Sequence, residues 1–481
     1  MNSQSRDREN LFIPRIINPL RVKQVIIFAA DAQVRKAKTI LEESLPWLRT
    51  EIIYDPQSVM HYASPEATVF LLDDTSLAFL DAERIRIQNK NVIMVLLSYQ
   101  EFIQCSPPQA AKQKYPYTAK ADLVFAVNQN TFAPQKILVS AVRAAEDLLN
   151  IEKYSRARRF IFHVVDDEPR WFSQFLPVLY DIVGQRVDVR ITRTYEESLQ
   201  FLFGVEEESQ VRKKNFITQG HGDDVVCLIT DIFFPKKNKL QSDAGRDLIR
   251  LVNKYYPRIP VIIASKAEEA REFSDLGFIL PKGDPGSLQK LKDYILNFTG
   301  LGDFLIYDKE GQELHRAKDI YGICQILTEA EKDTRKGRQL REIFESYGEK
   351  DKFSTWLYMH SYAELGDRLR PRRSQGQHFI IMLKRHFQSE IARIEQIPLV
   401  VDGQKIFSLS DLHASIKTLD PDIIQPYSDN DIISSWLDRK GYSELAEELR
   451  PIHGSGAKLS QTLLQIIDKW IKVYEERVRT L

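Results

Sequence analysis

The chain has 481 residues, of which 43% are hydrophobic and 28% charged, and its 67 Lys and Arg residues balance its 67 Asp and Glu residues. This composition predicts about three globular domains, and it argues against a nucleic-acid binder, which usually carries a basic surplus. No apolar run approaches the ~20 residues that a membrane span needs, so we expect a cytoplasmic protein without a membrane span.

The first α/β unit is predicted over residues 22–156, after a flexible N-terminal arm of residues 1–21. Short apolar runs alternate here with helical patterns, and a helix over 135–156 closes the unit. The runs are KQVIIFAA (23–30), EIIY (51–54), ATVFLLDD (67–74), NVIMVLLS (91–98) and ADLVFAV (121–127). Five short apolar strands separated by helices predict a doubly wound parallel sheet.

The same pattern repeats over residues 157–303, where the closing helix is SLQKLKDYILNF (287–298). A polar insertion over 206–224 is predicted to be a surface loop or a helix extension. The predicted strands are RRFIFHVV (158–165), VDVRIT (187–192), VVCLITDI (225–232), IPVIIAS (259–265) and LGFILP (276–281). The sequence therefore predicts two flavodoxin-like (βα)5 doubly wound domains in succession.

After residue 303 the chain is predicted to be mostly α-helical and internally repeated. FSTWLYMHSYAELGDRLRP (353–371) matches IISSWLDRKGYSELAEELRP (432–451), so that Trp356 pairs with Trp436 and Tyr362 with Tyr442. We predict one repeat over 304–395 and a second over 396–481, which ends in an amphipathic helix. Aromatic residues at helical spacing in these repeats indicate core packing.

Polar residues follow four strands of the second unit, at the sheet edge where open α/β folds bind ligands. Asp166 and Asp167 follow the first strand and Asp231 the third, while Ser265 ends the fourth and Lys282 follows the fifth. Clustered carboxylates need a counter-ion, and a hard Mg²⁺ ion prefers oxygen ligands. An aspartate can act as a nucleophile toward phosphorus, while lysine and serine can contact phosphoryl oxygens.

The motifs VVDDEPR, LITDIFFP, PVIIAS and FILPKG resemble the signature of response-regulator receiver domains. The resemblance implies Asp231 as phospho-acceptor, with Asp166, Asp167, Asp231 and the backbone carbonyl of Phe233 as Mg²⁺ ligands. It also implies Ser265 as the switch hydroxyl, Lys282 as the phosphate-contacting lysine, and Gly245 as the family glycine. This sequence departs from the family in three places: the loop from Pro235 to Gly245 is longer, Ile279 replaces a common aromatic residue, and Gly283 follows the lysine where proline is common.

The first unit resembles a degenerate copy of the same domain, a pseudo-receiver. Ala30-Asp31 stands at the acidic pair, Asp73 at the acceptor position, and Val127-Asn128 in the lysine region. Without an acidic pair and a lysine, Mg²⁺ binding should be weak. A docking or dimerising module is the favoured interpretation, and a phosphorylatable receiver or an unrelated flavodoxin-like domain are the alternatives.

The resemblance as a whole implies a response regulator of a phosphorelay, a phospho-acceptor rather than an enzyme. A histidine kinase or another phosphodonor would be its partner, with an unknown protein effector and room for a homodimer. The C-terminal repeats resemble a helical module found beside receiver-like domains in phosphoenolpyruvate-synthase-like proteins. Two other hypotheses are a constitutive scaffold or regulatory subunit whose repeats bind a partner enzyme, and a transcription factor, for which a basic recognition helix is lacking.

Cys105, Cys227 and Cys324 lack metal-binding spacing and are predicted to be reduced thiols.

Overall fold

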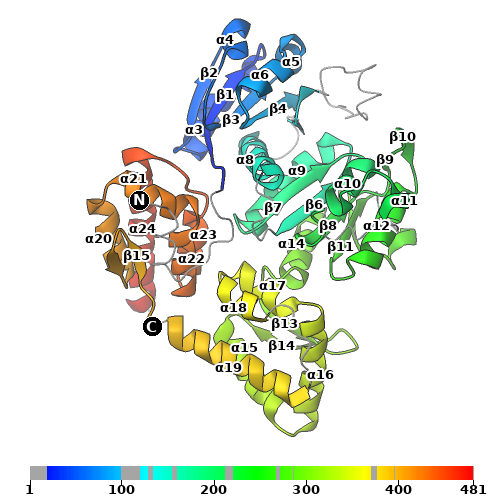
Figure 1. Ribbon diagram of the computed structural model, residues 1–481, viewed down its shortest axis with the longest axis vertical. Coiled ribbons are helices and arrows are strands. Elements are labelled where there is room, and N and C mark those ends of the chain that lie inside the picture. Colours follow the sequence, from blue (N-terminus) through cyan, green and yellow to red (C-terminus); the bar gives the residue numbers. More distant parts are fainter. Residues whose placement is uncertain are drawn as a thin grey trace. The chain divides into compact units, whose positions relative to one another are not determined.

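The computed structural model describes residues 19–98, 120–127, 134–153, 160–211, 220–266, 271–284, 286–369, 376–394 and 396–479. Residues 19–292 form one compact unit and residues 293–481 belong to another (Figure 1). Cys105 and Asn128 lie outside the described residues. Within the described part of the chain, no helix combines the length and the apolar character that crossing a bilayer requires.

The first sheet has five parallel strands in the order β2-β1-β3-β4-β5, which confirms the predicted flavodoxin-like topology. Its central strands are buried along their whole length because helices cover both faces, as parallel sheets require. The strands are β1 Val22–Phe28, β2 Arg49–Ile52, β3 Ala67–Leu72, β4 Val92–Ser98 and β5 Leu123–Ala126. The helices are α2 Ala32–Arg35, α3 Ala37–Ser44, α4 Pro56–Met60, α5 Asp74–Phe79, α6 Ala82–Gln88 and α8 Pro134–Lys153.

The second sheet repeats this topology, with the parallel order β12-β11-β8-β6-β7. Its strands are β6 Ile161–Val165, β7 Asp188–Thr192, β8 Val225–Thr230, β11 Val261–Ser265 and β12 Phe278–Pro281. Its helices are α9 Pro169–Val183, α10 Tyr195–Phe203, α11 Glu208–Val211, α12 Ala244–Tyr255 and α14 Ser287–Phe298, with the 3-10 turn η3 Arg271–Phe273. α11 lies in the predicted polar insertion over 206–224, of which residues 206–211 and 220–224 are described.

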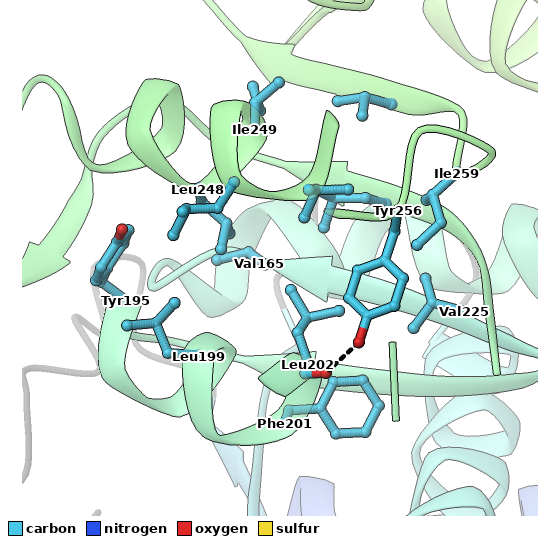
Figure 2. Close-up of a cluster of buried hydrophobic side chains, with 14 of the residues drawn as sticks. Val165, Tyr195, Leu199, Phe201, Leu202, Val225, Leu248, Ile249, Tyr256 and Ile259 are labelled. Carbon is cyan, nitrogen blue, oxygen red and sulfur yellow. Dashed lines mark hydrogen bonds between the residues drawn. The ribbon is translucent and has the colours of Figure 1, made fainter. Parts of the chain in front are cut away.

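One face of the second sheet packs against α10 and α12 in a single apolar cluster (Figure 2). Leu199 and Leu202 of α10 meet Leu248 of α12 over Val165 of β6. The Tyr256 hydroxyl at the end of α12 donates to the Leu202 carbonyl at 3.4 Å, which ties the two helices together. The cluster packs against β8, the strand that ends just before Asp231.

The long loop after Pro235 forms a β-hairpin, with β9 Phe234–Lys236 paired to β10 Lys239–Gln241. Lys237 and Asn238 both have positive φ, 54° and 61°, as the tight turn of a two-residue hairpin requires. The Lys236 ammonium pairs with Asp247 and lies 4.4 Å from the centre of the Tyr195 ring. The insertion is therefore anchored to α10 and α12.

The two α/β domains pack together through α8, the last helix of the first domain, which lies against α9 and the edge strand β7. Phe125 of β5 meets Phe172 of α9 edge to face, with ring centroids 6.2 Å apart. The Ala126 amide donates to the Ser173 hydroxyl at 3.1 Å. Because α9 is buried against both its own sheet and the first domain, almost every turn of it carries buried residues.

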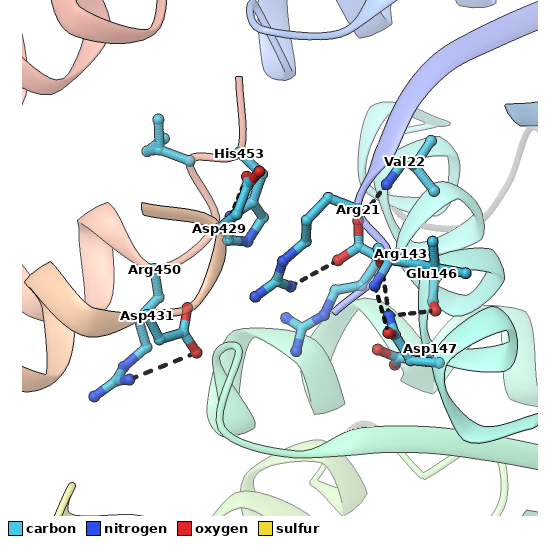
Figure 3. A network of polar contacts seen from close by, with 12 residues as sticks. Arg21, Val22, Arg143, Glu146, Asp147, Asp429, Asp431, Arg450 and His453 are labelled. Atoms are coloured by element: carbon cyan, nitrogen blue, oxygen red, sulfur yellow. Dashed lines mark hydrogen bonds and ion pairs between the residues drawn. The ribbon is translucent and has the colours of Figure 1, made fainter. Parts of the chain in front are cut away.

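α8 also holds residues 20–22, the segment that leads into β1. The Glu146 carboxylate accepts from the Arg21 guanidinium at 2.9 Å and from the Val22 amide at 2.8 Å (Figure 3). Asn150 exchanges two hydrogen bonds with the backbone of Leu20. Residues 20 and 21, assigned from the sequence to the flexible arm, are thus fixed to α8.

A buried acid lies at the contact between the two domains. Asp147 of α8 accepts hydrogen bonds from the Tyr180 hydroxyl and from the Val189 amide of β7, both at 2.9 Å. Burial, reinforced by the nearby Asp188 carboxylate, raises the pKa of Asp147 to about 7, against the opposing effect of the Arg143 guanidinium. The folded protein therefore retains a proton that the unfolded chain, with its ordinary pKa, releases more readily.

We expect Asp147→Asn to remove a pH dependence from the stability of this unit. Since the raised pKa favours the protonated acid in the folded state, wild-type stability should fall as the pH rises from about 4 to about 7, by up to about 1.4 kcal/mol per unit, and then level off. Asparagine mimics the neutral acid at every pH, so the variant should be the more stable protein at pH 8. Urea denaturation midpoints between pH 4.5 and 8 measure this.

A matched control is Asp181→Asn, which removes the exposed partner of Lys136 in the same interface. Its pH profile should follow that of the wild type. If the Asp147→Asn profile also runs parallel to the wild type, Asp147 is ionised in the fold and the prediction is wrong.

In its described residues, the helical region consists of two copies of one arrangement, a β-hairpin followed by five helices. The first copy is β13 Phe304–Tyr307, β14 Glu313–Ala317, α15 Ile320–Glu331, α16 Arg335–Glu349, α17 Lys352–Met359, α18 Ala363–Leu369 and α19 Gly376–Ile394. The second is β15 Leu399–Val401, β16 Gln404–Ile406, α20 Leu409–Thr418, α21 Pro421–Asp429, α22 Ile432–Arg439, α23 Ser443–Leu449 and α24 Gly456–Arg479. The two hairpins add strands to a region expected to be mostly helical.

Equivalent residues occupy equivalent places in the two copies. Asp351 and Asp431 both have positive φ and precede α17 and α22. The indole nitrogen of Trp356 donates to the Gly302 carbonyl at 2.9 Å, and that of Trp436 to the Ile397 carbonyl at 3.4 Å. The repeated tryptophans are therefore core residues that fix each copy to the segment before its hairpin.

The two copies are joined by buried ion pairs. The Arg439 guanidinium of α22, 3% exposed, pairs with Glu364 of α18 and donates to the Ser361 carbonyl at 2.6 Å. Within the second copy, Arg450 lies 4.0 Å from Asp431 and His453 lies 3.9 Å from Asp429 (Figure 3). Position 359 of the first copy, the equivalent of Arg439, is a buried methionine.

Candidate functional site

The site lies at the carboxyl ends of the strands of the second sheet. β6 and β8 are neighbours, and Asp166 and Asp231 are the first residues after their last strand positions. The Asp231 amide donates to the Val165 carbonyl at 2.9 Å, so the two strand ends are fixed side by side. The sheet register thus brings together two of the acids that the sequence predicted to converge.

Lys282 joins these acids. Its Nζ lies 2.7 Å from Oδ2 of Asp166 and 2.5 Å from Oδ2 of Asp231. The Lys282 amide donates to the Ser265 carbonyl at 2.9 Å, which holds the lysine to the end of the neighbouring strand. The lysine side chain is only 7% exposed, so its charge acts in a largely dry environment.

Burial dominates the protonation of the acidic pair. It raises the pKa of Asp166 to about 6, although the Lys282 ammonium opposes the shift. Burial and the Asp166 charge raise the pKa of Asp167 to about 7. Burial alone would lower the pKa of Lys282, but Asp166 and Asp231 outweigh it and raise the pKa above the usual range. Lys282 is therefore protonated in the folded protein, and its single positive charge does not balance the carboxylates around it.

The donor set fits a hard cation. Asp166, Asp167 and Asp231 together would carry three negative charges when ionised, against one on Lys282. Oδ2 of Asp166 accepts no hydrogen bond from the described residues, although the ammonium lies beside it. In the described ranges, no group of three or more His, Cys, Asp or Glu side chains is already gathered in a metal-binding arrangement. These three carboxylates are the residues that could hold Mg²⁺ once Lys282 moves from Asp166.

The other predicted residues lie around this centre. Ser265 ends β11, pairs in register with Pro281 and is 1% exposed. Phe233 lies between Asp231 and β9, and its side chain packs against the core beneath the site. Ile279 is paired with Ile263 in the sheet and packs against the same core. The roles of Ser265 as a switch and of the Phe233 carbonyl as a ligand stay predictions.

Gly245 is required by close packing at the acceptor strand. Its amide donates to the Ile232 carbonyl at 3.0 Å in the first turn of α12. A Cβ atom at this position would lie 2.4 Å from the Asp231 carbonyl oxygen and 2.7 Å from the Ile232 Cα. Because both atoms belong to the backbone, a side chain here would displace the acceptor residue itself.

The corresponding edge of the first sheet is built differently. Asp73, at the acceptor position, is 5% exposed and caps helix α5. One of its carboxylate oxygens accepts from the Ser76 amide at 2.7 Å and the other from the Asp31 amide at 2.5 Å. Asp74 accepts from the Ser98 hydroxyl at 2.9 Å. The carboxylate of Asp73 is therefore committed to the backbone.

Sequence reasoning missed Trp171, whose indole lies over Lys282, and the hairpin after Asp231. Nζ of Lys282 is 5.6 Å from the centre of the Trp171 ring. An aromatic residue in the first turn of the helix that follows the acidic pair was an available signal. The Lys237-Asn238 turn was another, because asparagine tolerates positive φ.

No protein-family model matches the sequence, and neither does any curated protein. Among solved structures, the chain is similar to a two-component system response regulator with a GGDEF domain, at 15% identity and a TM-score of 0.24, over 57% of this chain and 98% of that one. It is also similar to the C-terminus of E. coli RcsC, containing a linker region and a phosphoreceiver domain, at 15% identity and a TM-score of 0.21, over 58% and 94%. At TM-scores this low, neither structure adds weight to an assignment of function.

Proposed function

We propose that this chain is a response regulator that accepts a phosphoryl group on Asp231 from a histidine kinase or a small phosphodonor. The observation that carries the proposal is the pairing of Lys282 with both Asp166 and Asp231 at the carboxyl edge of the second sheet. One cation beside two acids, with a third acid adjacent, suits transfer of a phosphoryl group to a carboxylate.

The transfer uses one lone pair of the Asp231 carboxylate. A carboxylate oxygen attacks phosphorus as the bond from phosphorus to the donor's leaving group breaks, and the leaving group departs with the electron pair. The product is an aspartyl phosphate. Lys282 contacts a phosphoryl oxygen, and the Ile232 amide, 2.6 Å from Oδ1 of Asp231, holds the carboxylate in place. Bound Mg²⁺ would neutralise charge on the transferring group.

The first α/β domain serves as a docking module in this proposal. Both oxygens of its acceptor-position carboxylate, Asp73, accept from backbone amides, one of them at the start of α5, and the domain is fixed to α9 of the second. Phosphorylation would therefore act by changing the protein contacts that the flanking domains make. The chain would accept a single phosphoryl group rather than turn over a substrate.

The test is phosphorylation by acetyl phosphate with and without Mg²⁺, followed by intact-mass measurement. Wild-type protein should gain one base-labile phosphoryl group only when Mg²⁺ is present. Asp231→Asn should gain none, and Asp73→Asn, the matched variant in the first domain, should still gain one. If the wild type gains no such group, or if Asp231→Asn still gains one, Asp231 is not the acceptor.

The competing hypothesis is a constitutive scaffold or regulatory subunit whose C-terminal repeats bind a partner enzyme. A pull-down with phosphorylated protein, unphosphorylated protein and Asp231→Asn separates the two. Partners whose recovery depends on phosphorylation support the response regulator, whereas equal recovery by all three proteins supports the scaffold.

A further inference from the structure

Trp171 is placed beside the reacting groups without being one of them. It lies in the first turn of α9, five residues after Asp166, and is half-buried. Its amide donates to the Glu168 carbonyl at 3.0 Å, which fixes the start of the helix that carries the indole. The ring faces Nζ of Lys282, with 5.6 Å between the nitrogen and the ring centre. An ammonium within ~6 Å of an indole face is attracted by the ring quadrupole.

The groups around Lys282 restrict where its ammonium can lie. Nζ has three N–H groups, and the carboxylates of Asp166 and Asp231 lie at 2.7 and 2.5 Å. Among the described residues, the indole of Trp171 is a third group that faces this nitrogen. Since the lysine side chain is 7% exposed, water screens these interactions weakly. The charge is therefore held by two acids and one aromatic face.

Phosphorylation changes only part of this arrangement. When Asp231 receives a phosphoryl group, negative charge moves outward from the carboxylate to the phosphoryl oxygens. To contact the phosphoryl oxygens, the Lys282 ammonium would shift toward them and away from Asp166, while the indole would stay on α9. The aromatic face is thus the fixed element against which the ammonium moves.

We propose that Trp171 is a positioning residue for Lys282, and that its indole holds the ammonium where it meets the phosphoryl oxygens. This inference rests on the proposed function of Asp231. It predicts that Trp171 sets how fast Asp231 is phosphorylated and how long the phosphoryl group lasts.

The alternative is that Trp171 only fills space, and a graded series separates the two. Trp171→Phe keeps a weaker aromatic face, and Trp171→Leu keeps apolar volume without one. With acetyl phosphate and Mg²⁺, the rate of phosphorylation should fall in the order Trp, Phe, Leu, with a loss of about 3- to 30-fold for leucine. Equal rates in the three proteins, or equal losses in Phe and Leu, would overturn the proposal.

A second measurement does not depend on phosphorylation. Without any phosphodonor, Lys282→Met should change the tryptophan fluorescence of the protein, because a charge is removed from the indole face. The same substitution in a Trp171→Phe background should leave the fluorescence of the remaining tryptophans unchanged. Lys440→Met is a matched control, since Lys440 lies 5.9 Å from the ring centre of Trp436 in the C-terminal repeats. It should alter fluorescence equally in both backgrounds.

The outcomes distinguish this inference from the function on which it rests. If Lys282→Met leaves the fluorescence of Trp171 unchanged, the contact does not exist in solution and the inference fails, whatever the phosphorylation result. If the fluorescence responds but the wild type accepts no phosphoryl group, the proposed function fails and the positioning role fails with it.

Discussion

Replacing Lys282 by methionine is expected to destabilise the second α/β domain by about 3–5 kcal/mol at pH 8, because it leaves buried carboxylates without their counter-ion. Asp166 is 1% exposed and has the Lys282 ammonium 2.7 Å away. Methionine has a similar length and fills the same space, so the loss reports charge rather than volume. In the phosphorylation assay the variant should react about a hundredfold more slowly, as expected for the loss of a charged group aimed at the transferring oxygens.

The loss of stability should depend on pH and on Mg²⁺. Burial already raises the pKa of Asp166, and without the lysine it rises further, so at pH 5 the acid is protonated and needs no counter-ion. The penalty should therefore shrink toward pH 5, and Mg²⁺ should restore part of it at pH 8. Urea denaturation at both pH values measures this. Lys290→Met, which removes an exposed partner of Asp284, is the control and should leave the midpoint unchanged. A penalty that is the same at pH 5 and pH 8 would contradict the prediction.

Removing either repeated tryptophan should cost the C-terminal region about 3–5 kcal/mol, the usual range for deleting a large buried aromatic side chain. Trp356 is 2% exposed and Trp436 is fully buried. Trp356 also meets Phe304 of β13 edge to face, with ring centroids 5.9 Å apart. Because the two positions are equivalent, Trp356→Ala and Trp436→Ala should lower the free energy of unfolding by similar amounts.

Three further variants, Trp356→Phe, Trp436→Phe and Trp470→Ala, test where this stability comes from. The phenylalanine substitutions keep a ring but lose the indole hydrogen bond, and should cost about 1 kcal/mol for the hydrogen bond in addition to the lost volume. Trp470→Ala is the control, since Trp470 of α24 is half-buried, and it should cost clearly less. Losses below about 1 kcal/mol at Trp356 and Trp436 would show that the repeat is not held by its core.

Much of the fold could be predicted because its signals are local. Apolar runs of four to eight residues separated by helical patterns were enough to predict two parallel sheets. Because open α/β sheets bind ligands at the carboxyl ends of their strands, the sequence also placed Asp166, Asp231 and Lys282 together. The repeat was visible because its buried positions keep their residue types. The short hairpins β13–β14 and β15–β16 were missed because three to five residues of alternating character resemble a loop.

The contacts that were missed join residues far apart in the chain. Nothing in the sequence around Asp147 indicates that it accepts from Val189, and nothing around Asp73 indicates that its second oxygen accepts from the Asp31 amide. A periodic pattern shows which face of a helix is buried, but not which polar group meets it across an interface. The same reason hid Trp171, which reads as an ordinary apolar residue of α9.

The pairing of Arg439 with Glu364 gives the tandem of helical copies a direction. In the second copy the counterpart of Glu364 is Glu444, and it is already neutralised by Arg477 of its own α24, at 3.0 Å. The contact between the copies is thus heterologous: the first copy contributes the acid and the second copy contributes the arginine. Exchanging the order of the two copies would not reproduce this contact, because Met359 stands in the first copy where the second has Arg439.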